Sequence, residues 1–196
     1  MRIVTWNLNG IRAAHRKGLD NFIDKIDADI WLFQEVRALP EQMPDNWKPA
    51  VGHQVIWHPA KKKGYSGVST WSRVEMSEEG RGISTEVDIG DSEGRVIHTK
   101  HGNLHCINIY LPNGGANIHR QRFKDKWLED LLIWANKFID IDEPVLLCGD
   151  LNIAHTENDI WNPSGNKNTS GFLIHEREWF SRLLSTGWHD LLRIEV

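Results

Sequence analysis

The sequence contains little of what several classes of protein require. Its 196 residues include only two cysteines, Cys106 and Cys148, and each lies within an apolar run. Such a pair predicts buried free thiols and not a disulfide framework or a zinc site. No stretch approaches the roughly 18 to 20 apolar residues that cross a bilayer, and the apolar start breaks at Asn7, too early for a signal peptide. We therefore expect a cytoplasmic protein without a membrane segment.

No charge of one sign dominates the chain. It has 23 Lys+Arg against 27 Asp+Glu and a net charge of −4, which argues against blanket electrostatic binding to nucleic acid but leaves room for a local basic face. With 40% apolar and 26% charged residues it has the composition of a soluble domain of roughly 100 to 200 residues. Repeats, low-complexity tracts and linkers are not found, so we expect one domain over residues 1–196.

Short apolar and β-branched runs between turn residues predict many strands. We place them near residues 2–6, 30–33, 54–57, 67–71, 83–89, 95–99, 104–110 and 145–148. An apolar stripe with helical spacing predicts a helix over 123–138, a second helix ends near Gly187, and a weaker one over 19–26 links the first two strands. Many strands without an alternating strand–helix rhythm in the middle of the chain predict stacked sheets with helices outside.

Polar residues of a particular kind follow four of the predicted strands. The first strand is followed by Asn7 and Asn9, the second by Glu35, the seventh ends in Tyr110 with Asn113 beyond it, and the eighth is followed by Asp150 and Asn152. If these strands run in the same direction, the side chains converge on one rim, where loops on a rigid scaffold commonly carry sites. Carboxylate and carboxamide oxygens suit a hard cation such as Mg²⁺.

Each of these residues also has a purely structural interpretation. The asparagines could shape turns beside glycine or proline, and Glu35 could be a solvated strand end. Asp150 is harder to explain in this way because it follows the most apolar strand directly through Gly149. A carboxylate there would lie near a buried edge, where an unpaired charge is costly and a metal or partner is expected.

Basic clusters and histidines are less informative. The clusters Lys61–Lys63 and His119–Lys126 could meet phosphates or form solvated faces, and charge alone does not decide between these. His98, His101 and His105 have spacing that metal ligands can show, but the turn-like residues between them predict exposed histidines on a hairpin. Phosphate-binding P-loop, dinucleotide-binding and G-x-S-x-G motifs are absent from the sequence.

Five motifs, in order, resemble those of the exonuclease III family of apurinic/apyrimidinic (AP) endonucleases. They are TWNLNGIRA (5–13), LFQE (32–35), KGYSGV (63–68), NIYLPNG (108–114) and CGDLNIAH (148–155). The segments SGF (170–172), EREW (176–179) and DLLR (190–193) are similar to that family as well, so the resemblance spans essentially the whole chain. It implies a four-layered α/β sandwich of the deoxyribonuclease I type. The activity it implies is magnesium-dependent cleavage of DNA at abasic sites, often with 3′ to 5′ exonuclease activity.

The resemblance also implies roles for single residues. Glu35 would be the principal metal ligand, for Mg²⁺ or for Mn²⁺ in its place, with Asn7, Asp150 and Asn152 also at the metal and Asn9 and Asn113 as supports. Tyr110 would contact the scissile phosphate, Asn152 would help hold the phosphate and the attacking water, and Asp150 would orient or deprotonate that water. Arg12, Lys63 and Tyr65 would contact DNA. The expected partner is double-stranded DNA with abasic sites, bound by a monomer.

The sequence departs from the family in one respect. The family continues past the Asp-x-x-Arg element, here Asp190–Arg193, into further strands and a terminal Ser-Asp-His motif, which the sequence to Val196 lacks. We therefore expect a sandwich whose C-terminal strands are missing and whose sheet has an open edge. Two other functions stay open: a phosphodiesterase of lipid or inositol phosphates, and a catalytically silent protein that binds abasic DNA.

Overall fold

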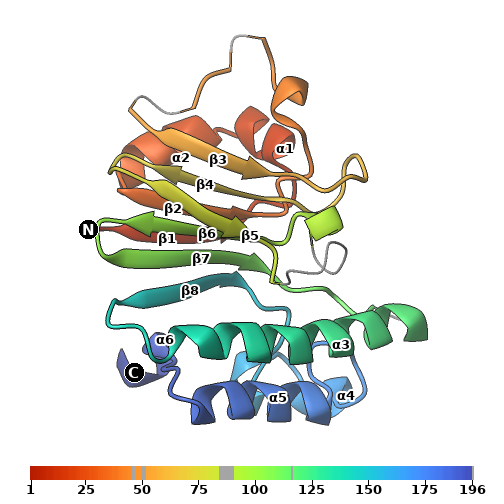
Figure 1. The fold of residues 1–196 in the computed structure, drawn as a ribbon. Helices are drawn as coiled ribbons and strands as arrows, with labels where there is room; N and C mark the ends of the chain where they lie inside the picture. The colour runs from red at the N-terminus through yellow and green to blue at the C-terminus, as the bar shows by residue number, and fades with distance from the viewer. Residues whose placement is uncertain (46, 50–51, 84–90, 116, 196) are drawn as a thin grey trace. The chain divides into compact units, whose positions relative to one another are not determined.

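The computed structural model describes residues 1–45, 47–49, 52–83, 91–115 and 117–195 (Figure 1). Its contacts divide the chain into two compact units. The first unit comprises Met1–Tyr110 and Glu143–Asp150, and the second comprises Leu111–Asp142 and Leu151–Val196. The strands belong to the first unit, whereas the second is built of helices and loops.

In the described part of the first unit, the strands form two four-stranded sheets. One has the order β1 (Ile3–Asn7), β2 (Ile30–Gln34), β4 (Val68–Ser72) and β3 (Gln54–His58). The other has the order β5 (Ser77–Arg81), β6 (Val96–His101), β7 (Leu104–Tyr110) and β8 (Val145–Asp150). The pairs β1–β2 and β7–β8 are parallel and the other pairs are antiparallel. The helices α1 (Ile11–Arg16) and α2 (Leu19–Ile26) connect β1 to β2 (Figure 1).

Alternating residues of β2 build two separate cores. Trp31 and Phe33 are fully buried and pack with Trp71 and with the apolar side of α1 and α2. Ile30 and Leu32 point to the other face, where they contact Cys106 of β7 between the two sheets. This period-two pattern fixes the strand register, because a slip by one residue would exchange the two faces.

A buried asparagine joins the two sheets. The Nδ2 of Asn108 in β7 donates to the carbonyls of Phe33, at 3.2 Å, and Ser69, at 3.0 Å. Its Oδ1 accepts from Nε2 of Gln34 at 2.8 Å. Because a buried polar group without a partner is costly, this network allows little sliding of one sheet over the other. The network therefore holds the ends of β2 and β7 in place, where Glu35 and Tyr110 lie.

The two cysteines are free thiols, as predicted. Burial raises the pKa of Cys106 to about 12 and that of Cys148 to about 11. Both thiols therefore stay protonated and unreactive near neutral pH.

The helices of the second unit are α3 (Ile118–Ala135), α4 (Pro163–Asn166), α5 (Ile174–Ser185) and α6 (Leu191–Glu195). Asn117 caps α3 by accepting the backbone N–H of His119 at 2.9 Å. Trp127 and Leu131 of the predicted stripe are fully buried, and Trp179 of α5 donates its indole N–H to the carbonyl of Leu128 at 2.7 Å. Among the described residues, none of the helices is both long enough and apolar enough to span a membrane. The described residues also include four short 3₁₀ segments: Pro40–Gln42, Asp91–Glu93, Asn136–Phe138 and Glu157–Asp159.

Most of the strands predicted from the sequence are present among these elements. Seven of the predicted strands have counterparts, with boundaries that agree within two residues. The strand predicted over 83–89 lies outside the described residues except for Ile83. Strand β5, with the sequence SEEGR, was not predicted because it has no apolar pattern. Among the described residues β8 pairs only with β7, so β8 forms an edge of its sheet, and its residues are half-buried.

The prediction of exposed hairpin histidines is wrong. His101 is 3% and His105 is 9% exposed. The ring nitrogens of His101 lie 3.2 Å from Oγ of Ser72 in β4, a strand of the other sheet, and 3.0 Å from Oγ1 of Thr99. Nε2 of His98 lies 2.8 Å from Nδ1 of His105, and Nε2 of His105 lies 2.8 Å from the carboxylate of Glu143. Burial, with repulsion from His105, lowers the pKa of His98 to about 4, so His98 is neutral near pH 7.

Gly149, the residue before Asp150, lies close to the backbone of β7. Gly149 has a φ of 149°, and a Cβ there would lie 1.9 Å from the carbonyl oxygen of Ile109. Gly149→Ala should therefore lower the free energy of unfolding by about 1 to 3 kcal/mol or more, as overpacking typically does. Urea denaturation would measure the change, with Gly80→Ala as the control, since a Cβ at Gly80 meets no atom within 4 Å. Equal stability of the two variants would contradict the tight packing of β7 against β8.

Candidate active site

The ends of four strands bring their polar side chains together in the first unit. The Nδ2 of Asn7 donates to Oε1 of Glu35 at 2.9 Å and to Oδ2 of Asp150 at 2.7 Å. The hydroxyl of Tyr110 donates to the same Oε1 of Glu35 at 2.8 Å. Residues that are up to 143 positions apart in the sequence thus form one hydrogen-bonded group. We call Asn7, Glu35, Tyr110 and Asp150 the carboxylate cluster.

The orientation of the Asn7 carboxamide follows from its neighbour. Its Oδ1 accepts the backbone N–H of Asn9 at 3.0 Å, so its NH₂ group must face the two carboxylates. Asn9 has a positive φ of 50°, a conformation that asparagine tolerates better than most residues. Asn9 therefore supports the carboxylate cluster through its backbone, while its own side chain is exposed.

Glu35 is held in its ionised form. Burial acts to raise the pKa of Glu35, but hydrogen bonds from Asn7 and Tyr110 and the guanidinium of Arg37 together hold that pKa below its ordinary value. Arg37 forms an ion pair with Oε2, and its side chain is 42% exposed. Because the Arg37 side chain is partly exposed, water can solvate its guanidinium when it moves away from Glu35.

Tyr110 keeps its proton near neutral pH. Burial, followed by the hydrogen bond to Glu35, raises the pKa of Tyr110 well above its ordinary value. A neutral phenol is a hydrogen-bond donor, so Tyr110 is suited to contact a negatively charged oxygen.

Arg95 supports Tyr110, although the sequence analysis did not select it. The side chain of Arg95 is 1% exposed, its guanidinium lies 4.7 Å from the centre of the Tyr110 ring, and it donates to the Tyr110 carbonyl at 2.8 Å. It also donates to the hydroxyl of Tyr65 at 3.2 Å and pairs with Glu93 at 2.7 Å. The only trace of this role in the sequence is a charged residue directly before an apolar strand.

The residues proposed to contact DNA lie in the first unit. Arg12 on α1 and Lys63 in the loop before β4 are exposed, and Tyr65 is half-buried. The ammonium of Lys62 lies 5.3 Å from the centre of the Tyr65 ring. Lysine, arginine and tyrosine side chains of this kind are typical partners of phosphate groups.

Asn113 and Asn152 are brought together in the second unit. The Nδ2 of Asn152 donates to the Leu111 carbonyl at 2.9 Å, and Oδ1 of Asn152 lies 3.5 Å from Nδ2 of Asn113. Asn152 has a positive φ of 47° and is half-buried. Its carboxamide is therefore held in one orientation.

The residues of the first unit fit a hard divalent cation. Two carboxylates, Glu35 and Asp150, both bond to the one NH₂ group of Asn7, so they lie close together and their charges repel. A cation near both oxygens would relieve that repulsion, and oxygen-only ligands match Mg²⁺. Oδ1 of Asn7 already accepts the backbone N–H of Asn9, so we infer that the role of Asn7 is to orient these two carboxylates.

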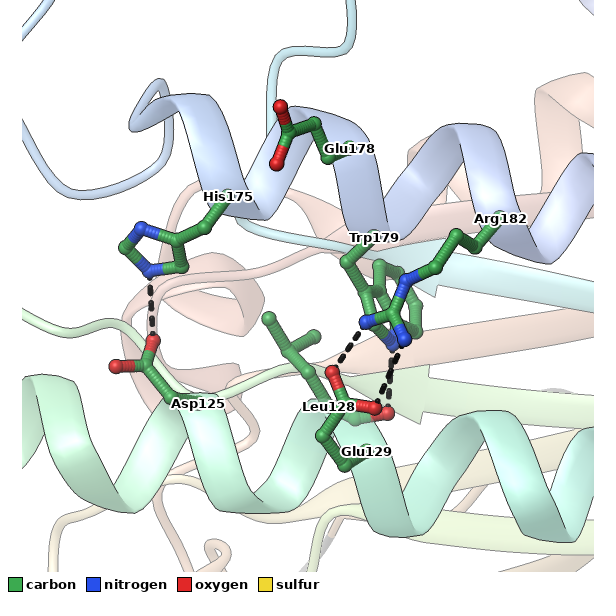
Figure 2. A pocket seen from close by; sticks show the side chains of 7 residues that line it. All are labelled: Asp125, Leu128, Glu129, His175, Glu178, Trp179 and Arg182. Atoms are coloured by element: carbon green, nitrogen blue, oxygen red, sulfur yellow. Dashed lines mark hydrogen bonds and ion pairs between the residues drawn. The ribbon is translucent and has the colours of Figure 1, made fainter.

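A second acidic group lies beside a pocket of about 380 Å³ in the second unit. Figure 2 shows His175 and Arg182 of α5 pointing toward Asp125 and Glu129 of α3. His175 Nε2 lies 3.0 Å from Oδ1 of Asp125. The adjacent Glu176 is fully buried, is neutralised by Lys124 at 2.7 Å and accepts two backbone N–H groups. Each of these acidic groups pairs with a basic side chain of α3 or α5, and we assign the cation to the carboxylate cluster, in which two carboxylates share one amide NH₂ group.

The chain is similar to known proteins in sequence and in structure. A family model described as "Endonuclease/Exonuclease/phosphatase family" matches residues 4–192. An exodeoxyribonuclease of Bacillus subtilis is 39% identical, with 98% of this chain and 75% of the relative covered. A DNA repair nuclease of Danio rerio is 34% identical, with 98% of this chain and 62% of the relative covered. The solved structure of an AP endonuclease from Archaeoglobus fulgidus has a TM-score of 0.84 at 27% identity and covers 98% of this chain and 73% of that one.

These comparisons confirm three expectations. They confirm the resemblance to the exonuclease III family of AP endonucleases, the α/β fold of the deoxyribonuclease I type, and the expectation of an enzyme. The chain spans three quarters of the Bacillus subtilis relative and less than two thirds of the Danio rerio relative.

Proposed function

Because the chain belongs to the endonuclease/exonuclease/phosphatase family, we propose that it is a magnesium-dependent DNA phosphodiester hydrolase that cleaves at abasic sites and also removes nucleotides from 3′ ends. The observation that carries the proposal is the carboxylate cluster, in which one amide NH₂ group orients two carboxylates beside a protonated phenol. The substrate class follows from the relatives, which are named as an exodeoxyribonuclease, a DNA repair nuclease and an AP endonuclease.

Glu35 and Asp150 would hold the divalent cation. When bound, Mg²⁺ would supply positive charge to the scissile phosphate and to the leaving oxygen. Asn7 keeps both carboxylates turned toward this place, and Arg37, which pairs with Glu35, would give way to the cation.

Asp150 acts on the nucleophile in this proposal. Its carboxylate accepts a proton from a water molecule as that water attacks phosphorus, and the P–O bond to the leaving oxygen breaks. Tyr110 donates a hydrogen bond from its hydroxyl to a phosphate oxygen that gains negative charge. A phenol that keeps its proton is suited to this role. Asn152, two residues after Asp150, would hold the phosphate and the water through its carboxamide.

Arg12, Lys63 and Tyr65 would contact the DNA backbone. Each phosphate that a cationic side chain neutralises makes the slope of the logarithm of the affinity against the logarithm of the salt concentration more negative by about one. These residues therefore contribute affinity for duplex DNA.

Substrate comparison tests the proposal. Purified protein with Mg²⁺ is given a duplex with one abasic site, the same duplex without the lesion, and a soluble phosphoinositide. We expect one cut at the abasic site, slower loss of nucleotides from the 3′ end of the intact duplex and no hydrolysis of the phosphoinositide. Hydrolysis of the phosphoinositide alone would assign the phosphodiesterase function. Binding of abasic DNA without any cut would identify a silent binding protein.

Metal binding gives a second test. Glu35→Gln removes one charge from the carboxylate cluster and keeps the shape of the side chain, so it should weaken Mg²⁺ binding by at least about tenfold, which corresponds to roughly 1.4 kcal/mol. Calorimetric titration of Mg²⁺ into both proteins would measure this, with Glu41→Gln as the control because Glu41 is an exposed carboxylate. Equal affinity of wild type and Glu35→Gln would refute the assignment of Glu35 as a ligand.

A further inference from the structure

The second unit contains an ion pair that is wholly removed from water. Nζ of Lys124 in α3 lies 2.7 Å from Oε1 of Glu176 in α5, and both side chains are 0% exposed. The basic cluster of α3 thus includes one lysine that cannot reach a phosphate, since Lys124 points into the unit. A buried pair is seldom better for stability than apolar residues of the same size, so its hydrogen bonds to other groups indicate its role.

Glu176 organises the loop before α5. Its Oε2 accepts the backbone N–H groups of Gly171, at 2.6 Å, and Leu173, at 3.0 Å. Its Oε1 lies 3.4 Å from Oγ of Ser170, which in turn accepts the N–H of Gly114 at 3.1 Å. Gly114 directly follows Asn113, so this chain of bonds ends at one of the two asparagines.

Lys124 acts on the other asparagine. Its Nζ donates to the carbonyl oxygen of Asn152 at 2.8 Å. The loop that Glu176 orders also contacts this segment. The backbone N–H of Ala154 donates to the carbonyl of Gly171 at 2.8 Å, and a Cβ on Gly171 would lie 3.1 Å from the carbonyl oxygen of Asn152. The backbone of Asn152 is therefore fixed by the charged pair and by the loop that the pair orders.

We propose that Lys124 and Glu176 are positioning residues that fix the carboxamides of Asn113 and Asn152. The proposal rests on the proposed function, in which Asn152 holds phosphate and water. One charge bonds to the backbone of Asn152, and the other orders the loop that bonds to the backbone next to Asn113. A bridge that served only to join α3 to α5 would not need the bonds to Asn152 and Ser170.

The test removes both charges together, because removing one would leave the other buried and unpaired. The double variant Lys124→Met, Glu176→Gln is compared with Lys126→Met, which removes an exposed lysine from the same helix. Four quantities are measured: the melting temperature, the chemical shift of the Asn152 side-chain amide, identified by its loss in Asn152→Asp, and kcat and KM on abasic duplex DNA.

We expect the double variant to melt cooperatively, to shift the Asn152 amide signal and to lose about 10- to 100-fold in kcat with KM within about threefold, since misplacement of roughly 1 Å can cost about 100-fold. Lys126→Met should match wild type in all four quantities. An unmoved amide signal with unchanged kcat in the folded double variant would overturn the proposal. If wild type itself does not cleave, the proposed function fails, while the amide signal still tests the positioning.

A milder variant covers the case in which the double variant does not fold. Ser170→Ala removes one hydroxyl that links Glu176 to the N–H of Gly114 and leaves no buried charge unpaired. It should shift the Asn113 side-chain amide signal and lower kcat about three- to tenfold with KM unchanged, as a smaller misplacement would. An unchanged Asn113 signal and unchanged kcat in this folded variant would overturn the proposal.

Discussion

Replacing Asp150 by asparagine should lower turnover on abasic duplex DNA by about 100- to 10,000-fold, the range over which a general base contributes. Asparagine has nearly the same shape and can still accept the hydrogen bond from Asn7, so the carboxylate cluster keeps its packing. It cannot take a proton from water, and it removes a negative charge that repels phosphate. DNA affinity should therefore stay the same or rise slightly.

Single-turnover cleavage and a binding titration on the same duplex separate the two effects. Asp142→Asn makes a matched control, because Asp142 is exposed and precedes the same strand, β8. If Asp150→Asn loses affinity while bound substrate turns over at the wild-type rate, Asp150 serves binding and the proposed chemistry is wrong.

Replacing Tyr110 by phenylalanine should lower kcat by about 100- to 1,000-fold, as loss of one donor to a developing oxyanion typically does. The ring and its contact with Arg95 remain, so the melting temperature should change little. Glu35 loses one of the hydrogen bonds that lower its pKa, so that pKa should rise.

Tyr65 provides the comparison, since it is the only other tyrosine. Tyr65→Phe should act mainly on KM, because we place Tyr65 at the DNA backbone and not at the reacting phosphate. A Tyr110→Phe variant that changes KM and leaves kcat at the wild-type value would show that the hydroxyl serves substrate binding.

Much of the carboxylate cluster could be predicted from sequence because of how strands end. Asn7, Glu35, Tyr110 and Asp150 each end or follow an apolar run, and parallel pairing of β1 with β2 and of β7 with β8 places such ends on a common rim. The apolar runs define the strands well, since buried strands tolerate few polar residues. Their catalytic roles still stand as predictions from the resemblance.

Other features depend on contacts between distant residues and leave little trace in the sequence. Arg95 precedes a strand like many solvated residues do, yet it is buried against Tyr110. Lys124 has the appearance of one cation in a basic helix face, yet its charge is neutralised by a residue 52 positions later, Glu176, and is fully buried. Strand β5 is held by backbone bonds to β6 and needs no apolar pattern. Each depends on a partner that local sequence does not reveal.

The dependence of cleavage on a divalent cation tests the central claim most directly. A duplex with one abasic site and a labelled 5′ end is incubated with excess wild-type protein in EDTA, and Mg²⁺ is then added above the concentration of EDTA. The account predicts no cut in EDTA, one cut at the abasic site after Mg²⁺ is added, and a rate at least about 100-fold lower for Asp150→Asn under the same conditions. Cleavage at the same rate in EDTA, or at the wild-type rate in Asp150→Asn, would contradict it.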